Sequence, residues 1–182
     1  MKILILHGIE GCAGKHWQQW LHDKLIAKSH MVIMPSLSKA DRPNRLIWLK
    51  EIKKAVGNSE LTDLVIVGHS LGVPASLDFI EQADKQIKAL ISVSGFSEDY
   101  GAEMNSYFMK KGTIDFKKVN EKLSKAFVVF GDDDPYVPQS QLKLLAKKLA
   151  VRPKIIKDGG HLNTDSGYVT FPWLFRIIES LS

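Results

Sequence analysis

Short apolar segments alternate with longer amphipathic segments along this 182-residue chain. The apolar segments are rich in Val and Ile, and the segments between them repeat their apolar positions near the helical period, as residues 43–56 do. Such an alternation is typical of an α/β fold, in which helices cover both faces of a mostly parallel sheet. The predicted strands are 2–6, 31–34, 63–67, 89–93, 126–130 and 154–157. The predicted helices are 16–28, 43–56, 71–83, 139–149 and 171–181.

The organisation of the chain predicts a single domain over residues 1–182, because we find no internal repeat, low-complexity tract or interdomain linker. Residues 95–124 form an unusually long connection between two predicted strands and contain several aromatic and methionine side chains. We expect these side chains to pack a crossover helix, to form a small cap over a pocket, or to do both.

The composition favours a folded protein, with 45% hydrophobic and 25% charged residues. The net charge is +5, but the lysines occur as scattered pairs, so we expect no nucleic-acid partner. The N-terminal apolar run is too short for a signal peptide, and no apolar segment approaches the roughly 18 residues that span a bilayer. The single cysteine, Cys12, excludes an intramolecular disulfide. We therefore expect a cytoplasmic protein that does not bind membranes.

A candidate nucleophile lies in the sequence GHSLG at residues 68–72, which matches the pattern G-x-S-x-G. The motif lies between the predicted strand 63–67 and the predicted helix 71–83. In that context the serine occupies a sharp strand-to-helix turn that exposes its hydroxyl, and the flanking glycines avoid collisions with neighbouring elements. The alternative is an ordinary tight turn of a doubly wound protein. We interpret Ser70 as the nucleophile.

Two further loops follow predicted strands and contain acid and histidine residues. Residues 131–138 read GDDDPYVP, and residues 158–161 read DGGH. Loops at the carboxyl ends of parallel strands gather at one edge of the sheet, where sites in such folds lie. Each loop alone is also compatible with a simple turn. Along the chain, however, the order is serine, then acid, then histidine, which is the order in α/β-hydrolases. Of the six histidines, only His161 follows both Ser70 and the acidic loop.

The chain resembles the small α/β-hydrolase-fold serine hydrolases typified by the retinoblastoma-binding serine hydrolase and the YdeN-like bacterial proteins. The resemblance rests on these motifs, on the sequence HWQQWL at 16–21 and on the short length of the chain. The resemblance spans nearly the whole chain and implies about six parallel strands, helices on both faces and no large lid. It also implies that the acid is Asp134, within the pattern D-P-x-x-P, with Asp133 and Asp132 as second choices. The L-x-C-x-E motif is not matched around the single cysteine, so retinoblastoma binding is not implied.

The predicted activity is hydrolysis of small acyl esters through an acyl-enzyme intermediate. Ser70 attacks the acyl carbon, His161 takes its proton, and Asp134 orients the imidazole. We predict that the backbone N–H groups of Leu71 and Ile9 bind the oxyanion. We expect no cofactor, no metal and a small-molecule acyl substrate; the sequence identifies no protein partner. Ester, thioester and amide substrates remain open.

Other functional classes are less well supported. The loop GIEGCAGKH at 8–16 follows a predicted strand, but its glycine spacing departs from both common nucleotide-binding patterns. A metal site made by His7, His69 and His161 is a remote alternative, and for His7 and His69 we favour support of the loops. The main alternative is a binding or regulatory protein that keeps the hydrolase fold with little turnover.

Overall fold

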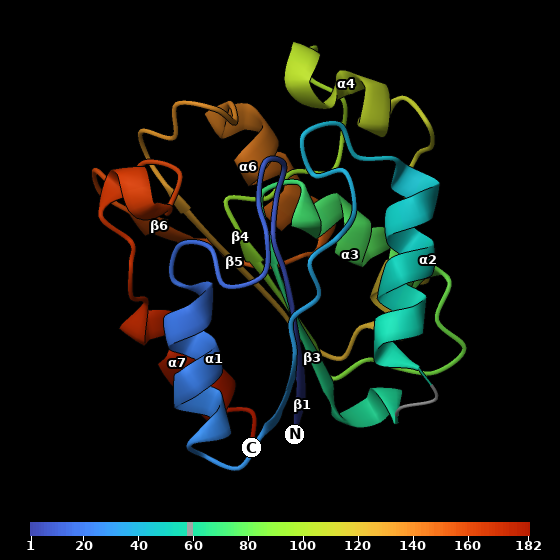
Figure 1. Ribbon diagram of the computed structural model, residues 1–182. Helices are drawn as coiled ribbons and strands as arrows, with labels where there is room; N and C mark the ends of the chain where they lie inside the picture. The colour runs from blue at the N-terminus through green and yellow to red at the C-terminus, as the bar shows by residue number, and fades with distance from the viewer. Residues whose placement is uncertain (58–59) are drawn as a thin grey trace.

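A parallel sheet runs through the centre of the molecule, with helices on both faces (Figure 1). The computed structural model describes residues 1–57 and 60–182, and within them the sheet has six strands in the order β2-β1-β3-β4-β5-β6. The strands are β1 (Lys2–Leu6), β2 (Met31–Ile33), β3 (Leu64–His69), β4 (Ala89–Val93), β5 (Ala126–Gly131) and β6 (Lys154–Ile156). The helices are α1 (Gln18–Ile26), α2 (Arg45–Val56), α3 (Gly72–Glu81), α4 (Glu103–Met109), α5 (Phe116–Lys122), α6 (Gln139–Lys148) and α7 (Pro172–Glu179).

The predicted α/β class is confirmed, and each predicted strand and helix has a counterpart whose ends differ by at most two residues. Helices α4 and α5 were not predicted separately, because each has only seven residues, too few for a clear helical period. Both lie within residues 95–124. None of the helices in the described part of the chain combines the length and apolarity that a bilayer crossing needs.

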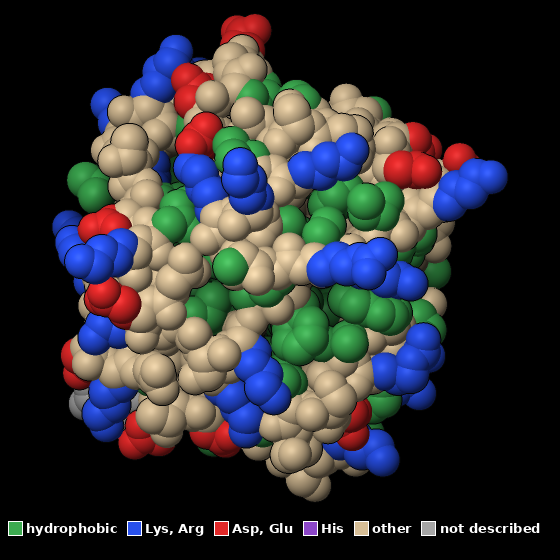
Figure 2. All heavy atoms as spheres, turned by 180° about the vertical axis from the view of Figure 1, so that it is seen from behind, with side chains coloured by type: hydrophobic (Ala, Val, Ile, Leu, Met, Phe, Trp, Pro, Cys, Tyr) green, Lys and Arg blue, Asp and Glu red, His purple; other side chains and the backbone are tan. Residues whose placement is uncertain are grey.

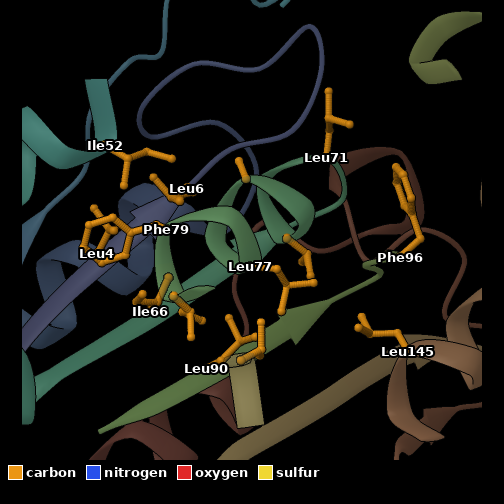
Figure 3. Packing of buried hydrophobic residues seen from close by; sticks show 14 of the residues in the cluster. Leu4, Leu6, Ile52, Ile66, Leu71, Leu77, Phe79, Leu90, Phe96 and Leu145 are labelled. Carbon is orange, nitrogen blue, oxygen red and sulfur yellow. The ribbon is translucent and has the colours of Figure 1, made fainter. Parts of the chain in front are cut away.

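Alternate side chains of each strand enter two separate hydrophobic clusters on the two faces of the sheet. Ile3 and Ile5 of β1 pack in the cluster that includes side chains of α1 and α7. Leu4 and Leu6 pack in the cluster that includes side chains of α2, α3, α5 and α6. Figure 3 shows Leu4 and Leu6 close to side chains of α2 and α3. Because both faces are covered, the strands are apolar at nearly every position instead of alternating with polar residues.

The outer surface carries Lys and Arg side chains in several separate groups. Figure 2 shows one face of the molecule, on which these side chains are dispersed among hydrophobic and uncharged polar groups. They form no continuous stripe on this face.

The strand order places a topological switch point between β1 and β3, which are hydrogen-bonded neighbours. The chain leaves β1 through α1 on one face of the sheet and leaves β3 through α3 on the opposite face (Figure 1). Connections that diverge in this way leave a crevice at the carboxyl ends of the two strands, where ligands of such sheets bind. Ser70 directly follows β3 and therefore lies at this crevice.

Arg45 joins the 95–124 segment to the helices that cover the sheet. Its buried side chain donates hydrogen bonds of 2.7 and 2.6 Å, from Nε and Nη2, to the Asp78 carboxylate on α3. Its Nη1 donates to the backbone carbonyls of Met109 and Gly112, just where α4 ends. One guanidinium thus connects α2, α3 and the end of α4.

We expect Arg45→Met to lower the free energy of unfolding by about 3–5 kcal/mol, because it leaves the Asp78 carboxylate buried without its partner. Chemical denaturation measures this change. The double variant Arg45→Met with Asp78→Leu should recover part of the loss, since it removes the uncompensated charge. A single variant within about 1 kcal/mol of the parent protein would contradict a buried ion pair at this position.

Candidate active site

Ser70 occupies a strained turn between β3 and α3. Its φ of +53° lies in the left-handed region, which few non-glycine residues adopt. The turn is fixed by a hydrogen bond of 2.9 Å from the Ser70 N–H to the carbonyl of Val93 on β4. A Cβ at Gly72 would lie 2.6 Å from the His7 carbonyl oxygen, and one at Gly68 would lie 3.0 Å from that of Gly72. The close packing explains why both glycine positions of the serine motif are occupied by glycine.

The Ser70 hydroxyl is open to a pocket of about 400 Å³. Its Oγ makes no hydrogen bond within the described residues, yet it is not a buried atom. The pocket is bordered by the loops after β1, β5 and β6, by the turn after β3 and by part of the 95–124 segment. Ser70 therefore presents an unpaired hydroxyl where loops from four strands and this segment meet.

The imidazole of His161 is held by Asp134. The Nδ1 atom of His161 donates to Oδ2 of Asp134 at 2.8 Å and lies 3.0 Å from Oδ1. The Asp134 side chain is fully buried, and its Oδ1 also accepts hydrogen bonds from the N–H groups of Tyr136 and Val137 at 2.9 and 3.0 Å. Because Nδ1 keeps its proton to donate to the carboxylate, Nε2 of the neutral ring is left as an acceptor.

Ser70 and His161 line the same pocket, but no hydrogen bond joins the serine hydroxyl to the imidazole in the structure. Like the serine oxygen, His161 Nε2 has no partner within the described residues and is not buried. Hydrogen bonds between a nucleophile and its base often tighten only when substrate is bound. The arrangement thus brings together an unpaired hydroxyl and an unpaired basic nitrogen.

The two aspartates that precede Asp134 hold the loop that carries the imidazole. Asp132 Oδ1 accepts a hydrogen bond from the N–H of Asp158 at 2.8 Å. Asp133 Oδ1 accepts one from the N–H of Gly160 at 2.7 Å. Of the three acids considered from the sequence, only Asp134 contacts the imidazole, and the other two fix its supporting loop.

Two free backbone donors border the pocket, at the residues predicted to bind the oxyanion. The N–H groups of Ile9 and Leu71 donate to no acceptor within residues 1–57 and 60–182. The loop after β1 lies close against the serine turn, since a Cβ at Gly8 would lie 2.9 Å from the Ser70 Cβ. Both donors are therefore in loops that meet at the nucleophile.

His7 and His69 support the loops around the pocket. Nε2 of His69 donates to the His161 carbonyl at 3.0 Å, and burial lowers the pKa of His69 well below its usual 6.5, with a further contribution from the neighbouring His161. His7 Nε2 accepts from the N–H of Leu37 at 2.9 Å, and its Nδ1 donates to the Gly8 carbonyl at 2.8 Å. Burial also lowers the pKa of His7. Both rings are neutral near pH 7.

Residues 95–124 contribute both to the pocket and to the packing of the crossover. Phe96, Tyr100 and Met104 of this segment line the pocket. The rings of Phe96 and Tyr100 meet edge to face with centroids 5.1 Å apart. Val119 of α5 is buried in the hydrophobic cluster that includes α3. Phe96, Phe108 and Met109 from the first half of the segment are buried in the same cluster, so the segment both borders the pocket and packs against the helices. Its role as a cap stays a prediction.

Some residues that line the pocket were not predicted from the sequence. His16, Asn105 and Thr164 line the pocket but belong to no recognised catalytic pattern. Only the HWQQWL motif pointed to His16, and it did so through the resemblance alone. Among the described residues, no group of three or more His, Cys, Asp or Glu side chains is arranged to hold a metal ion.

Comparison with known proteins gives matches that span nearly the whole chain. The family model described as serine hydrolase matches residues 3–180. The protein YdeN of Bacillus subtilis strain 168 is 28% identical over 181 residues, which cover 98% of this chain and 95% of YdeN. The crystal structure of the ydeN gene product has a TM-score of 0.91 at 27% identity, covering 99% of this chain and 97% of that chain.

More distant structures share the fold. A carboxylesterase structure from Nitrososphaera gargenis has a TM-score of 0.66 at 12% identity and covers 98% of this chain and 88% of its own. Est1E from Butyrivibrio proteoclasticus has a TM-score of 0.69 at 18% identity and covers 99% of this chain and 84% of its own.

We expect the stability of the folded protein to fall as the pH drops below about 6.5, because His69 stays neutral when folded but binds a proton when unfolded. Between about pH 6.5 and about pH 5.5, His69 alone should remove about 1 kcal/mol from the free energy of unfolding. His7 and His16, whose pKa values are also lowered by burial, act in the same direction. Urea denaturation at several pH values measures the slope.

The matched control is His69→Gln, which keeps a side-chain N–H for the His161 carbonyl and does not titrate. Its free energy of unfolding should change less steeply between about pH 6.5 and about pH 5.5. The same slope in both proteins would contradict the neutral, buried state of His69.

Proposed function

Because the chain belongs to the serine hydrolase family, we propose that it hydrolyses small carboxylic esters through Ser70, His161 and Asp134. One observation carries this proposal. An unpaired hydroxyl on a strained turn shares a pocket with an imidazole whose Nδ1 is bound by a buried carboxylate. A free hydroxyl beside an oriented base is the arrangement that nucleophilic catalysis requires.

In the first half of the reaction, Ser70 Oγ forms a bond to the carbonyl carbon of the ester. His161 Nε2 takes the hydroxyl proton, and the resulting imidazolium is stabilised by the Asp134 carboxylate. The tetrahedral intermediate then collapses, the bond to the alcohol oxygen breaks, and the imidazolium gives its proton to the leaving alcohol. The acyl group remains on Ser70.

The second half of the reaction releases the acid. Water adds to the acyl carbon while His161 Nε2 accepts its proton, and the bond to Ser70 Oγ then breaks as the proton returns to that oxygen. In both halves a negative charge develops on the former carbonyl oxygen. The free N–H groups of Leu71 and Ile9 are the proposed donors to it, and losing one such donor typically lowers kcat by about 10²–10³.

The size and lining of the pocket favour a short acyl group. The pocket has a volume of about 400 Å³. Phe96, Tyr100 and Met104, all from the 95–124 segment, contribute apolar surface to it, which we call its apolar side. We assign this side to the acyl chain. The carboxylesterase activity named for the Nitrososphaera gargenis structure supports the choice of ester among the acyl derivatives.

Ser70 is expected to react with a fluorophosphonate probe, because an activated serine attacks phosphorus as it attacks an acyl carbon. Wild-type protein should be labelled and should hydrolyse p-nitrophenyl butyrate, and Ser70→Ala should do neither. Circular dichroism of the variant checks its fold. A folded wild-type protein that neither reacts with the probe nor hydrolyses the ester would instead support the alternative, a binding protein that keeps the fold with little turnover.

Short acyl chains should be preferred. We expect kcat/KM for p-nitrophenyl acetate and butyrate to exceed that for the dodecanoate by on the order of tenfold, when all are assayed as dissolved monomers. Met104→Ala, which shortens a side chain of the apolar side, should shift the preference towards longer chains. Ile26→Ala is the control, since Ile26 is exposed and lies outside the pocket. A higher rate on the dodecanoate with wild type would overturn the assignment.

A further inference from the structure

His16 has no part in the proposed chemistry, yet its side chain lines the same pocket as Ser70. Its backbone φ is +62°, a conformation that few non-glycine residues adopt. Strain of this kind persists only where the surrounding structure enforces it, and it is concentrated at functional sites. The chain therefore holds a histidine at a position where its backbone alone would favour glycine.

The hydrogen bonds of His16 fix which nitrogen carries the proton. Its Nδ1 accepts a hydrogen bond of 3.1 Å from the backbone N–H of Thr164 and lies 2.9 Å from the Thr164 hydroxyl. In a neutral imidazole the nitrogen that accepts has no proton, so Nε2 carries the N–H. Burial lowers the pKa of His16, and Lys15 lowers it further, so the ring is neutral near pH 7.

The N–H at Nε2 of His16 is an unused donor. It has no acceptor within the described residues, and Nε2 is not one of the buried atoms without a partner. The ring packs against His69, with the two centroids 5.4 Å apart, and the centroid of His69 lies 5.0 Å from that of His161. The N–H is therefore open to water and to any bound molecule that offers an acceptor.

The surroundings of His16 distinguish it from the apolar side of the pocket. The loops after β1 and β6, joined by the hydrogen bonds between His16 and Thr164, contribute mainly polar side chains to the pocket. Two of these side chains, Glu10 and Asp165, are carboxylates, and one, Lys15, carries a positive charge. The Lys15 ammonium group donates to the backbone carbonyl of Glu10 at 2.7 Å. This balance does not favour an anion, so the acceptor that suits His16 is a neutral oxygen.

We propose that His16 is a substrate-binding residue that selects esters whose alcohol part carries a neutral carbonyl oxygen, which accepts a hydrogen bond from Nε2. The inference rests on the proposed ester hydrolysis at Ser70. If the acyl chain occupies the apolar side formed by Phe96, Tyr100 and Met104, the alcohol part faces the polar loops. A substrate that fills the pocket displaces water from Nε2, so an analogue without this oxygen leaves the donor unpaired and reacts less well.

The test compares two butyrate esters whose alcohols have four carbons each, 2-oxobutyl butyrate and butyl butyrate, with proton release as the readout. The intrinsic reactivities differ, so the measured quantity is the ratio of kcat/KM for the two esters in each protein. His16→Gly removes the ring and accepts a positive φ without strain. His16→Asn also tolerates this backbone and retains a side-chain N–H.

We expect His16→Gly to lower the ratio by on the order of tenfold, whatever change the loss of the ring causes in the rate on butyl butyrate. His16→Asn should keep part of the preference. An equal loss on both esters in His16→Gly, with an unchanged ratio, would show that the ring only supports the loops. A wild-type preference for carboxymethyl butyrate over both esters would identify an anion site instead and would also overturn the inference.

Failure of the inference is separable from failure of the proposed function. If the wild-type protein reacts with a fluorophosphonate and hydrolyses butyl butyrate but His16→Gly leaves the ratio unchanged, only the role of His16 is refuted. If the wild-type protein is not labelled and cleaves neither ester, ester hydrolysis itself is refuted, and the role of His16 with it.

Discussion

The close approach between the loop after β1 and the turn that carries Ser70 is the constraint on which the rest of the site depends. A Cβ at Gly72 would lie 2.6 Å from the His7 carbonyl oxygen, and a Cβ at Gly8 would lie 2.9 Å from the Ser70 Cβ. No larger residue fits at either position without movement of the backbone. The same approach brings the free N–H groups of Ile9 and Leu71 to the border of one pocket. The glycines thus determine where the backbone donors lie as well as how the serine turn packs.

A second set of interactions holds the loop after β6 against this turn. Asp132 and Asp133, at the end of β5, accept hydrogen bonds from backbone N–H groups of that loop, and His69 donates to its carbonyl at His161. These contacts fix the loop from the ends of β5 and β3, two strands that β4 separates in the sheet. With the loop fixed in this way, the hydrogen bond to Asp134 has only to set the orientation of the His161 ring. A rigid loop matters because a displacement of about 1 Å in a catalytic group can lower the rate by about 10²-fold.

The parts of the structure that follow from local sequence patterns could be predicted, and those that follow from contacts between distant segments could not. The strands could be predicted because residues buried on both faces of a sheet are apolar throughout, and Ser70 because its turn requires flanking glycines. The three consecutive aspartates could be ranked only through the resemblance, which implies Asp134. Their hydrogen bonds show that Asp134 binds the His161 imidazole, whereas Asp132 and Asp133 bind backbone N–H groups of its loop. The role of Arg45 depends on Asp78 and Met109, which are 33 and 64 residues away along the chain, and the tautomer of His16 depends on Thr164, which is 148 residues away.

The electrostatics of the proposed reaction depend on the neutral state of the neighbouring histidines. When Ser70 attacks, His161 becomes an imidazolium, and the ring of His69 lies with its centroid only 5.0 Å away. A charged His69 would repel that imidazolium and raise the barrier, whereas the burial that lowers the pKa of His69 keeps it uncharged. Asp134 is then the nearest group that compensates the new charge, and because its side chain is fully buried, water screens the attraction weakly. The histidine that supports the loop therefore also keeps the surroundings of the base free of competing positive charge.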